Sequence, residues 1–198
     1  MRGFNLAQYE FRTLKAQQLM QQHELGALLL TTETNVRYFT GFLTRFWESP
    51  TRPWYLIIPQ SGKPIAVIPS IGEALMSKTW VEDIRTWPSP DLTDDGINLL
   101  SETLNEVAKK NRVGIPSGAE THVRIPRNDL IKLTQNVNLS HDFEIVKNLR
   151  MIKSKEEIIK IENACMIAKE AFSRVPEIAS ENIRLDEVFR RFQVLCLE

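Results

Sequence analysis

Residues 149–164 read LRMIKSKEEIIKIENA, and this stretch decides how the chain divides. Ser154 and Glu157 have the Ser-x-x-Glu spacing of a capping box, in which each side chain accepts a hydrogen bond from a backbone N–H at a helix start. A helix is therefore expected to begin directly after Ser154. The stretch predicts a joint between two domains.

Beyond this joint the chain carries two apolar stripes. The first recurs at steps of three and four, as one face of a helix requires, at Ile158, Ile161, Cys165, Ala168 and Phe172. The second follows Pro176, with Val188, Phe189, Phe192 and Leu195 on one face. Apolar faces need cover, so we interpret residues 146–198 as a linker and the first helices of a second domain that is incomplete at Glu198.

Upstream of the joint, residues 1–145 alternate between helix and strand signals. A first helix is expected over about 5–22, with Asn5 as its N-cap and Phe11, Leu14 and Leu19 as its apolar positions. The uniformly apolar run 27–30 is typical of a strand covered on both faces. Two further apolar runs, 54–58 and 64–68, flank a turn at 60–63 and predict a hairpin.

The rest of this part is expected to alternate helix and strand, over about 72–79, 81–87, 97–110, 112–115, 126–133 and 137–139. Such an alternation predicts an α/β fold in which a mixed β-sheet lies between helices. The sequence thus predicts one α/β domain over residues 1–145 and a helical start of a second.

Composition excludes several classes of function. The 25 basic and 25 acidic side chains cancel, and no basic run interleaved with aromatic residues occurs, so a nucleic-acid partner is not expected. No apolar run approaches the roughly 18 residues of a membrane span. The two cysteines, Cys165 and Cys196, fit apolar helix positions and are interpreted as small buried hydrophobes in a reducing cytoplasm.

The sequence contains no pattern that predicts catalysis within this chain. The three histidines, His23, His122 and His141, lie far apart in the sequence without the spacing of metal ligands. Asp94-Asp95, in a turn, and His141-Asp142, at an expected strand exit, are interpreted as solvated turn residues rather than metal ligands. No catalytic residue and no metal ligand is therefore assigned, and the chain alone is expected to be inactive.

One segment does have the composition of a contact site. Residues 42–54 hold two Trp, two Phe and two Arg, interrupted by two prolines. Aromatic faces and guanidinium groups can bind a carboxylate or a guanidino-type ligand. The alternative is that these aromatic side chains only pack over the edge of the sheet.

Three motifs follow one another along the chain, at residues 35–42 (NVRYFTGF), 112–115 (RVGI) and 149–157 (LRMIKSKEE). Together they resemble the N-terminal part of the creatinase, prolidase and aminopeptidase P family. In that family an N-terminal α/β domain precedes a "pita-bread" catalytic domain, which holds two divalent metal ions in most peptidase members. The resemblance implies that the metal ligands of a full-length parent would lie beyond Glu198.

The resemblance also implies a role for the segment 42–54. In this family the N-terminal domain builds the dimer, and in creatinase a loop from it contacts the substrate of the partner subunit. The matching residues here are Arg52, which precedes Pro53 and Trp54, and either Phe46 or Trp47. The expected function is thus that of a non-catalytic N-terminal domain of a creatinase-like or X-Pro dipeptidase-like hydrolase acting on a small molecule or a dipeptide.

Two readings from other classes remain beside it. The chain could be a free-standing interaction module that pairs with a full-length relative through the dimer surface. It could also be a small-ligand-binding module that uses Arg52. Cosedimentation with a full-length relative and ligand-induced shifts of the unfolding temperature distinguish these readings.

Overall fold

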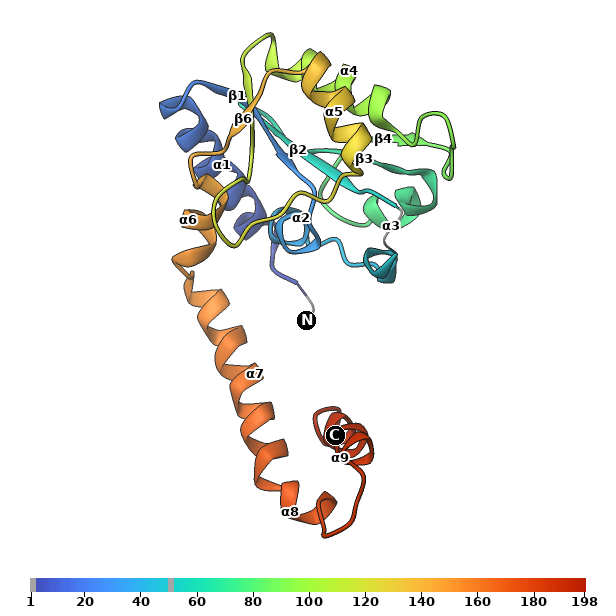
Figure 1. The fold of residues 1–198 in the computed structure, drawn as a ribbon. Coiled ribbons are helices and arrows are strands. Elements are labelled where there is room, and N and C mark those ends of the chain that lie inside the picture. Colours follow the sequence, from blue (N-terminus) through green and yellow to red (C-terminus); the bar gives the residue numbers. More distant parts are fainter. Residues whose placement is uncertain (1–2, 50–51) are drawn as a thin grey trace. The chain divides into compact units, whose positions relative to one another are not determined.

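A computed structural model describes residues 3–49 and 52–198 of the chain (Figure 1). The chain divides into two compact units, Met1–Met151 and Ile152–Glu198. The first unit ends six residues later than the expected boundary at 145, because α6 (Ile145–Met151) buries Ile145 and Val146 in its core.

The first unit is built on a six-stranded mixed sheet with the order β4-β3-β2-β1-β5-β6. The strands are β1 (Leu25–Leu30), β2 (Tyr55–Pro59), β3 (Ile65–Pro69), β4 (Asp83–Trp87), β5 (Arg112–Ile115) and β6 (Leu139–His141). β1 pairs antiparallel with β2 and parallel with β5, so that Leu28 lies between Ile58 and Gly114. The expected α/β fold with a mixed sheet is confirmed.

Helices cover both faces of this sheet and form two apolar cores (Figure 1). On one face lie α1 (Leu6–Gln22), α2 (Glu33–Thr40) and α6, and on the other lie α4 (Ile97–Ala108) and α5 (Arg127–Asn136). Leu28 and Leu30 of β1 belong to the first core, whereas Ala27 and Leu29 belong to the second. The continuous apolar run of β1 is therefore explained by burial on both sides.

The buried face of α1 differs from the expected one. Asn5 caps the helix by accepting a hydrogen bond from Gln8 N, as expected. Phe11 and Leu14, however, are 52% and 54% exposed. The buried face instead includes three polar residues, Arg12, Thr13 and Gln17, beside Tyr9, Ala16 and Met20.

Arg12 and Gln17 on this face have hydrogen-bond partners, whereas the buried Thr13 Oγ1 has none among the described residues. Arg12 Nη1 donates to Tyr38 O at 2.7 Å, and its guanidinium lies 4.2 Å from the centroid of the Tyr38 ring. Gln17 Nε2 donates to the carbonyl oxygens of Pro59 and Gly62 at 3.0 and 2.8 Å. A buried polar group with a satisfied hydrogen bond avoids the cost of desolvation, so apolar spacing alone predicted the wrong face.

Two other expected elements are present as the expected type, a helix and a strand, but with different bounds. The expected helix over 72–79 is a short turn, η2 (Ser70–Gly72) followed by α3 (Glu73–Met76), and the last strand lies at Leu139–His141 rather than 137–139. Asp142 is buried rather than solvated, because its carboxylate accepts hydrogen bonds from Glu144 N and Val146 N at the start of α6.

The second unit consists of α7 (Lys155–Ser173), α8 (Val175–Ile178) and α9 (Leu185–Leu195). The capping box is confirmed, since Ser154 accepts from Glu157 N and Glu157 accepts from Ser154 N. Phe172 and Phe192 pack together with ring centroids 4.8 Å apart. Ile158, Ile161 and Phe172 of the first stripe and Phe189 of the second are nevertheless exposed, whereas Val188, Phe192 and Leu195 are half-buried. Cys165 is exposed and Cys196 is half-buried, so their interpretation as buried hydrophobes was wrong.

Within residues 3–49 and 52–198, no helix is long and apolar enough to cross a membrane.

Candidate functional site

The segment 42–54 leaves the end of α2 through a tight reversal. Gly41 caps α2 with φ of 75°, a left-handed conformation that glycine adopts without strain. The chain then forms η1 (Arg45–Glu48), where Thr44 accepts a hydrogen bond from Phe46 N at 3.2 Å. Pro50 and Thr51 lie outside the described residues.

An aromatic cluster anchors this segment to the sheet. Trp54 is fully buried at its centre, with ring centroids of Phe42, Phe46 and Trp47 at 5.6, 6.2 and 6.0 Å. Gly72 lies against the same indole, and a Cβ added there would approach Trp54 Cζ3 to 2.2 Å. Packing therefore accounts for Phe42, Trp47 and Trp54, which was the alternative interpretation of their role.

The three residues expected at the site lie together but differ in access. The Phe46 side chain is 38% exposed, whereas Trp47 is 8% exposed. The guanidinium carbon of Arg52 lies 5.7 Å from the centroid of the Phe46 ring, within the range of a cation–π contact. Arg52 and Phe46 thus form an accessible pair of a cation and an aromatic face.

Arg124, which the sequence did not single out, ties this segment to the end of β1. Its Nη2 donates to Ser49 O, and its backbone N donates to Thr31 Oγ1 at 3.0 Å. Its guanidinium also lies 5.2 Å from the centroid of the Trp47 ring, and burial lowers the pKa of the group despite the nearby Glu33 carboxylate. No sequence pattern links residues 75 positions apart, so this contact had no signal to find.

The described residues offer no metal site. In ranges 3–49 and 52–198 no group of three or more His, Cys, Asp or Glu side chains could hold a metal ion. His141 instead packs against Phe143, with ring centroids 4.0 Å apart. Asp94 accepts hydrogen bonds from Ile97 N and Asn98 N at the start of α4, as a turn residue.

The sequence matches a known family over most of the first unit. Residues 12–152 match the model of the Creatinase/Prolidase N-terminal domain. The chain belongs to this family. The matched region contains the whole sheet and the segment 42–54, and it ends at the division between the two units.

Relatives extend the match beyond this domain. An uncharacterised hydrolase/peptidase of Sinorhizobium fredii is 26% identical over 192 residues, which cover 93% of this chain and 48% of that protein. The prolidase of Thermococcus sibiricus has a TM-score of 0.78 at 21% identity, covering 94% of this chain and 49% of that one. Dipeptidase PepE of Mycobacterium ulcerans has a TM-score of 0.74 at 21% identity, covering 98% and 50%. The chain spans about half the length of the curated relatives it matches.

Proposed function

We propose that this chain is the non-catalytic N-terminal half of an X-Pro dipeptidase-like or creatinase-like hydrolase. The observation that carries the proposal is the family match over residues 12–152, which includes the segment 42–54. Relatives described as hydrolase, peptidase, prolidase and dipeptidase support the reaction class. In the proposal, divalent metal ions and catalytic side chains are contributed by residues outside this chain.

The proposed role of this half is to form the dimer and to place Arg52 and Phe46 at the active site of the partner subunit. Their arrangement supports this role, because the Phe46 ring holds the Arg52 guanidinium and lowers the entropy cost of ordering it on binding. A guanidinium can bind a substrate carboxylate through two parallel hydrogen bonds. Trp47 is proposed to support the segment rather than to contact substrate, since it is largely buried.

The two cysteines are unpaired, which supports a reducing compartment, and we place the protein in the cytoplasm.

Kinetics of an Arg52→Lys variant test the proposal in a polypeptide that joins this chain to the proposed catalytic half, with an X-Pro dipeptide as substrate. Lysine keeps the charge but lacks the planar fork, so kcat/KM should fall by about ten- to a hundredfold. Arg45→Lys is the matched control, because Arg45 is an exposed arginine of the same segment. Equal kinetics of the two variants, or a loss of activity that parallels a loss of folding, would show that the segment only packs against the sheet.

A further inference from the structure

A cavity of about 390 Å³ lies in the unit Met1–Met151, where three parallel strands end. Its walls come from the segments after β1, β5 and β6, at residues 32–35, 116–122 and 142–151. In the sheet, β2, β3 and β4 follow β1 on one side, and β5 and β6 lie on its other side. The direction in which successive strands are added therefore reverses at β1. Ligands of open α/β sheets bind outside the carboxyl ends of the strands at such a reversal.

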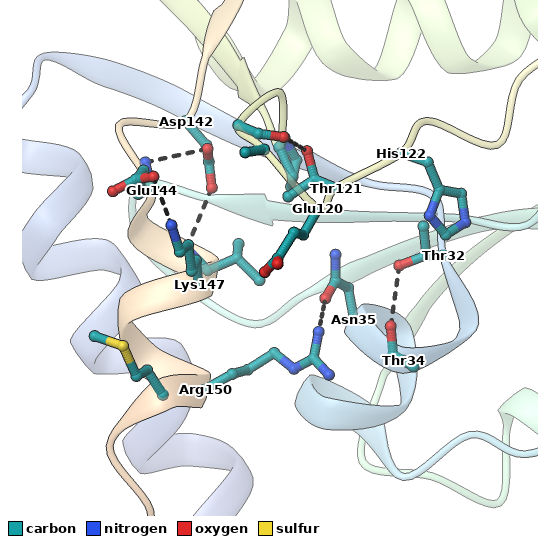
Figure 2. A pocket seen from close by; sticks show the side chains of 15 residues that line it. Thr32, Thr34, Asn35, Glu120, Thr121, His122, Asp142, Glu144, Lys147 and Arg150 are labelled. Carbon is teal, nitrogen blue, oxygen red and sulfur yellow. Dashed lines mark hydrogen bonds and ion pairs between the residues drawn. The ribbon is translucent and has the colours of Figure 1, made fainter.

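The walls of this cavity carry both signs of charge. Figure 2 shows the Glu120 carboxylate and the Arg150 guanidinium turned toward the same space, between α6 and the start of α2. Glu144 and Lys147 form an ion pair beside them, with Oε1 and Nζ 2.9 Å apart. The Asp142 carboxylate is buried and accepts hydrogen bonds from Glu144 N, directly before α6, and from Val146 N of α6. The remaining two acidic and two basic side chains balance.

One end of the cavity has groups that suit a carboxylate. Arg150 Nη1 donates to Asn35 Oδ1 at 2.9 Å, and this bond leaves the Asn35 amide nitrogen directed into the cavity (Figure 2). Asn35 is only 7% exposed, so its orientation is held by packing. Thr32 is the N-cap of α2, yet its side chain makes no capping hydrogen bond. An amide donor, a guanidinium and the positive end of a helix all favour a negative group.

We propose that this cavity binds a small zwitterion, an amino acid or a short peptide. Its carboxylate lies against Asn35 and Arg150, and its ammonium group lies against Glu120. Lys147 interacts with Glu120 as well as with Glu144, and the charges of the lining balance. A simple anion would therefore add an uncompensated negative charge to the cavity, whereas a zwitterion adds no net charge. The volume lies in the range of roughly 300–1,000 Å³ typical of small-ligand sites. This site is distinct from the segment 42–54 and does not depend on its proposed role.

Titration of the 198-residue chain with glycylglycine tests this proposal, by calorimetry and by NMR of backbone amides. The expected result is binding with shifts concentrated at Asn35, Gly118, Ala119 and Lys147. Acetate supplies only the carboxylate and methylammonium only the cation, so each should bind at least about tenfold more weakly. No binding of glycylglycine at millimolar concentration, or equally tight binding of acetate, would overturn the assignment to a zwitterion.

Variants then assign the contacts. Glu120→Gln removes the negative charge at constant shape and should weaken glycylglycine binding by about tenfold or more, as should Arg150→Gln. Glu102→Gln is the matched control, because Glu102 is an exposed glutamate on α4. Ala119→Trp should block the cavity without touching any charge. Unfolding temperatures near that of the parent identify folded variants, and glycylglycine binding unchanged in both Glu120→Gln and Ala119→Trp would refute the site.

Discussion

Arg124 illustrates what a single residue contributes to the candidate site. Its side chain reaches Ser49 and the Trp47 ring from a loop on the far side of β1, and its backbone N–H binds Thr31. The sequence predicts the aromatic and cationic content of the segment 42–54, because composition is local. It cannot predict which distant cation fixes the segment, because that depends on the tertiary path of the chain.

Replacing Arg124 by leucine should loosen this segment. The variant loses the hydrogen bond to Ser49 O and the contact with the Trp47 ring, so the free energy of unfolding should fall by about 1–2 kcal/mol. Hydrogen exchange should accelerate over 46–49. Arg127→Leu, at an exposed arginine of α5, is the control and should change stability by less than about 0.5 kcal/mol. Similar exchange over 46–49 in both variants would show that Arg124 does not hold the segment.

At the scale of elements, periodicity predicted the sheet better than the helices around it. β1 and the β2–β3 hairpin were predicted because burial on two faces gives long apolar runs. α2 was not predicted as a helix, since it is only eight residues long, lacks a side-chain cap and contains the strand-favouring residues Val36, Tyr38, Phe39 and Thr40. Tertiary packing against the first core holds it in place.

Gly72 joins η2 to the aromatic cluster, and Gly72→Ala should disturb the candidate site. The added Cβ would meet the buried Trp54 ring at 2.2 Å, so the indole must move. Overpacking of this kind costs about 1–3 kcal/mol of stability. The near-ultraviolet circular dichroism of the tryptophans should change as well. Gly62→Ala is the control: its φ of 90° strains an alanine, but no atom lies within 4 Å of its Cβ. An unchanged tryptophan signal in Gly72→Ala would contradict the packing described.

Arg85 on β4 forms an ion pair with Glu106 on α4, and this pair should make the stability of the fold depend on pH. A hydrogen bond from Arg85, with Nη2 and Glu106 Oε1 2.9 Å apart, lowers the pKa of Glu106. Because the folded-state pKa is depressed, the pair stabilises the fold above about pH 4.3, the ordinary pKa of glutamate. That contribution is lost as the pH falls through the folded-state pKa.

Glu106→Gln should therefore be less stable than the parent at neutral pH and equal to it in acid. The Glu106 side chain is 60% exposed, so solvent screening limits the difference to about 0.2–1 kcal/mol. Urea unfolding at neutral pH and at about pH 2 measures it. Glu102→Gln on the same helix should show no such difference, and a Glu106→Gln deficit that persists in acid would contradict the ion-pair explanation.

At the scale of the whole molecule, the sequence predicted the family and the α/β class, because motifs 35–42, 112–115 and 149–157 keep their order along the chain. It did not predict the cavity at the carboxyl ends of β1, β5 and β6. That cavity depends on which strands become neighbours, and single-sequence periodicity does not contain strand order.

The two units should differ in local stability. In Ile152–Glu198 most large apolar side chains are exposed, including Ile158, Phe172 and Phe189. Elements with few buried contacts open at low cost, so amides of α7 and α9 should exchange faster than those of 56–58 in β2. Hydrogen exchange measured by mass spectrometry on a monomeric sample tests this. Equal protection in α9 and β2 would contradict it.

The central claim is that Arg52 serves the active site of the partner subunit, and subunit mixing tests it most directly. Polypeptides that join this chain to the proposed catalytic half and carry Arg52→Ala are mixed with the 198-residue chain, which supplies an intact Arg52 and no assigned catalytic residue. The account predicts that mixed dimers regain X-Pro dipeptide hydrolysis as the chain is added, whereas an Arg52→Ala form of the chain restores none. Restoration by both chains, or by neither when mixed dimers have formed, would contradict a contribution of Arg52 across the dimer.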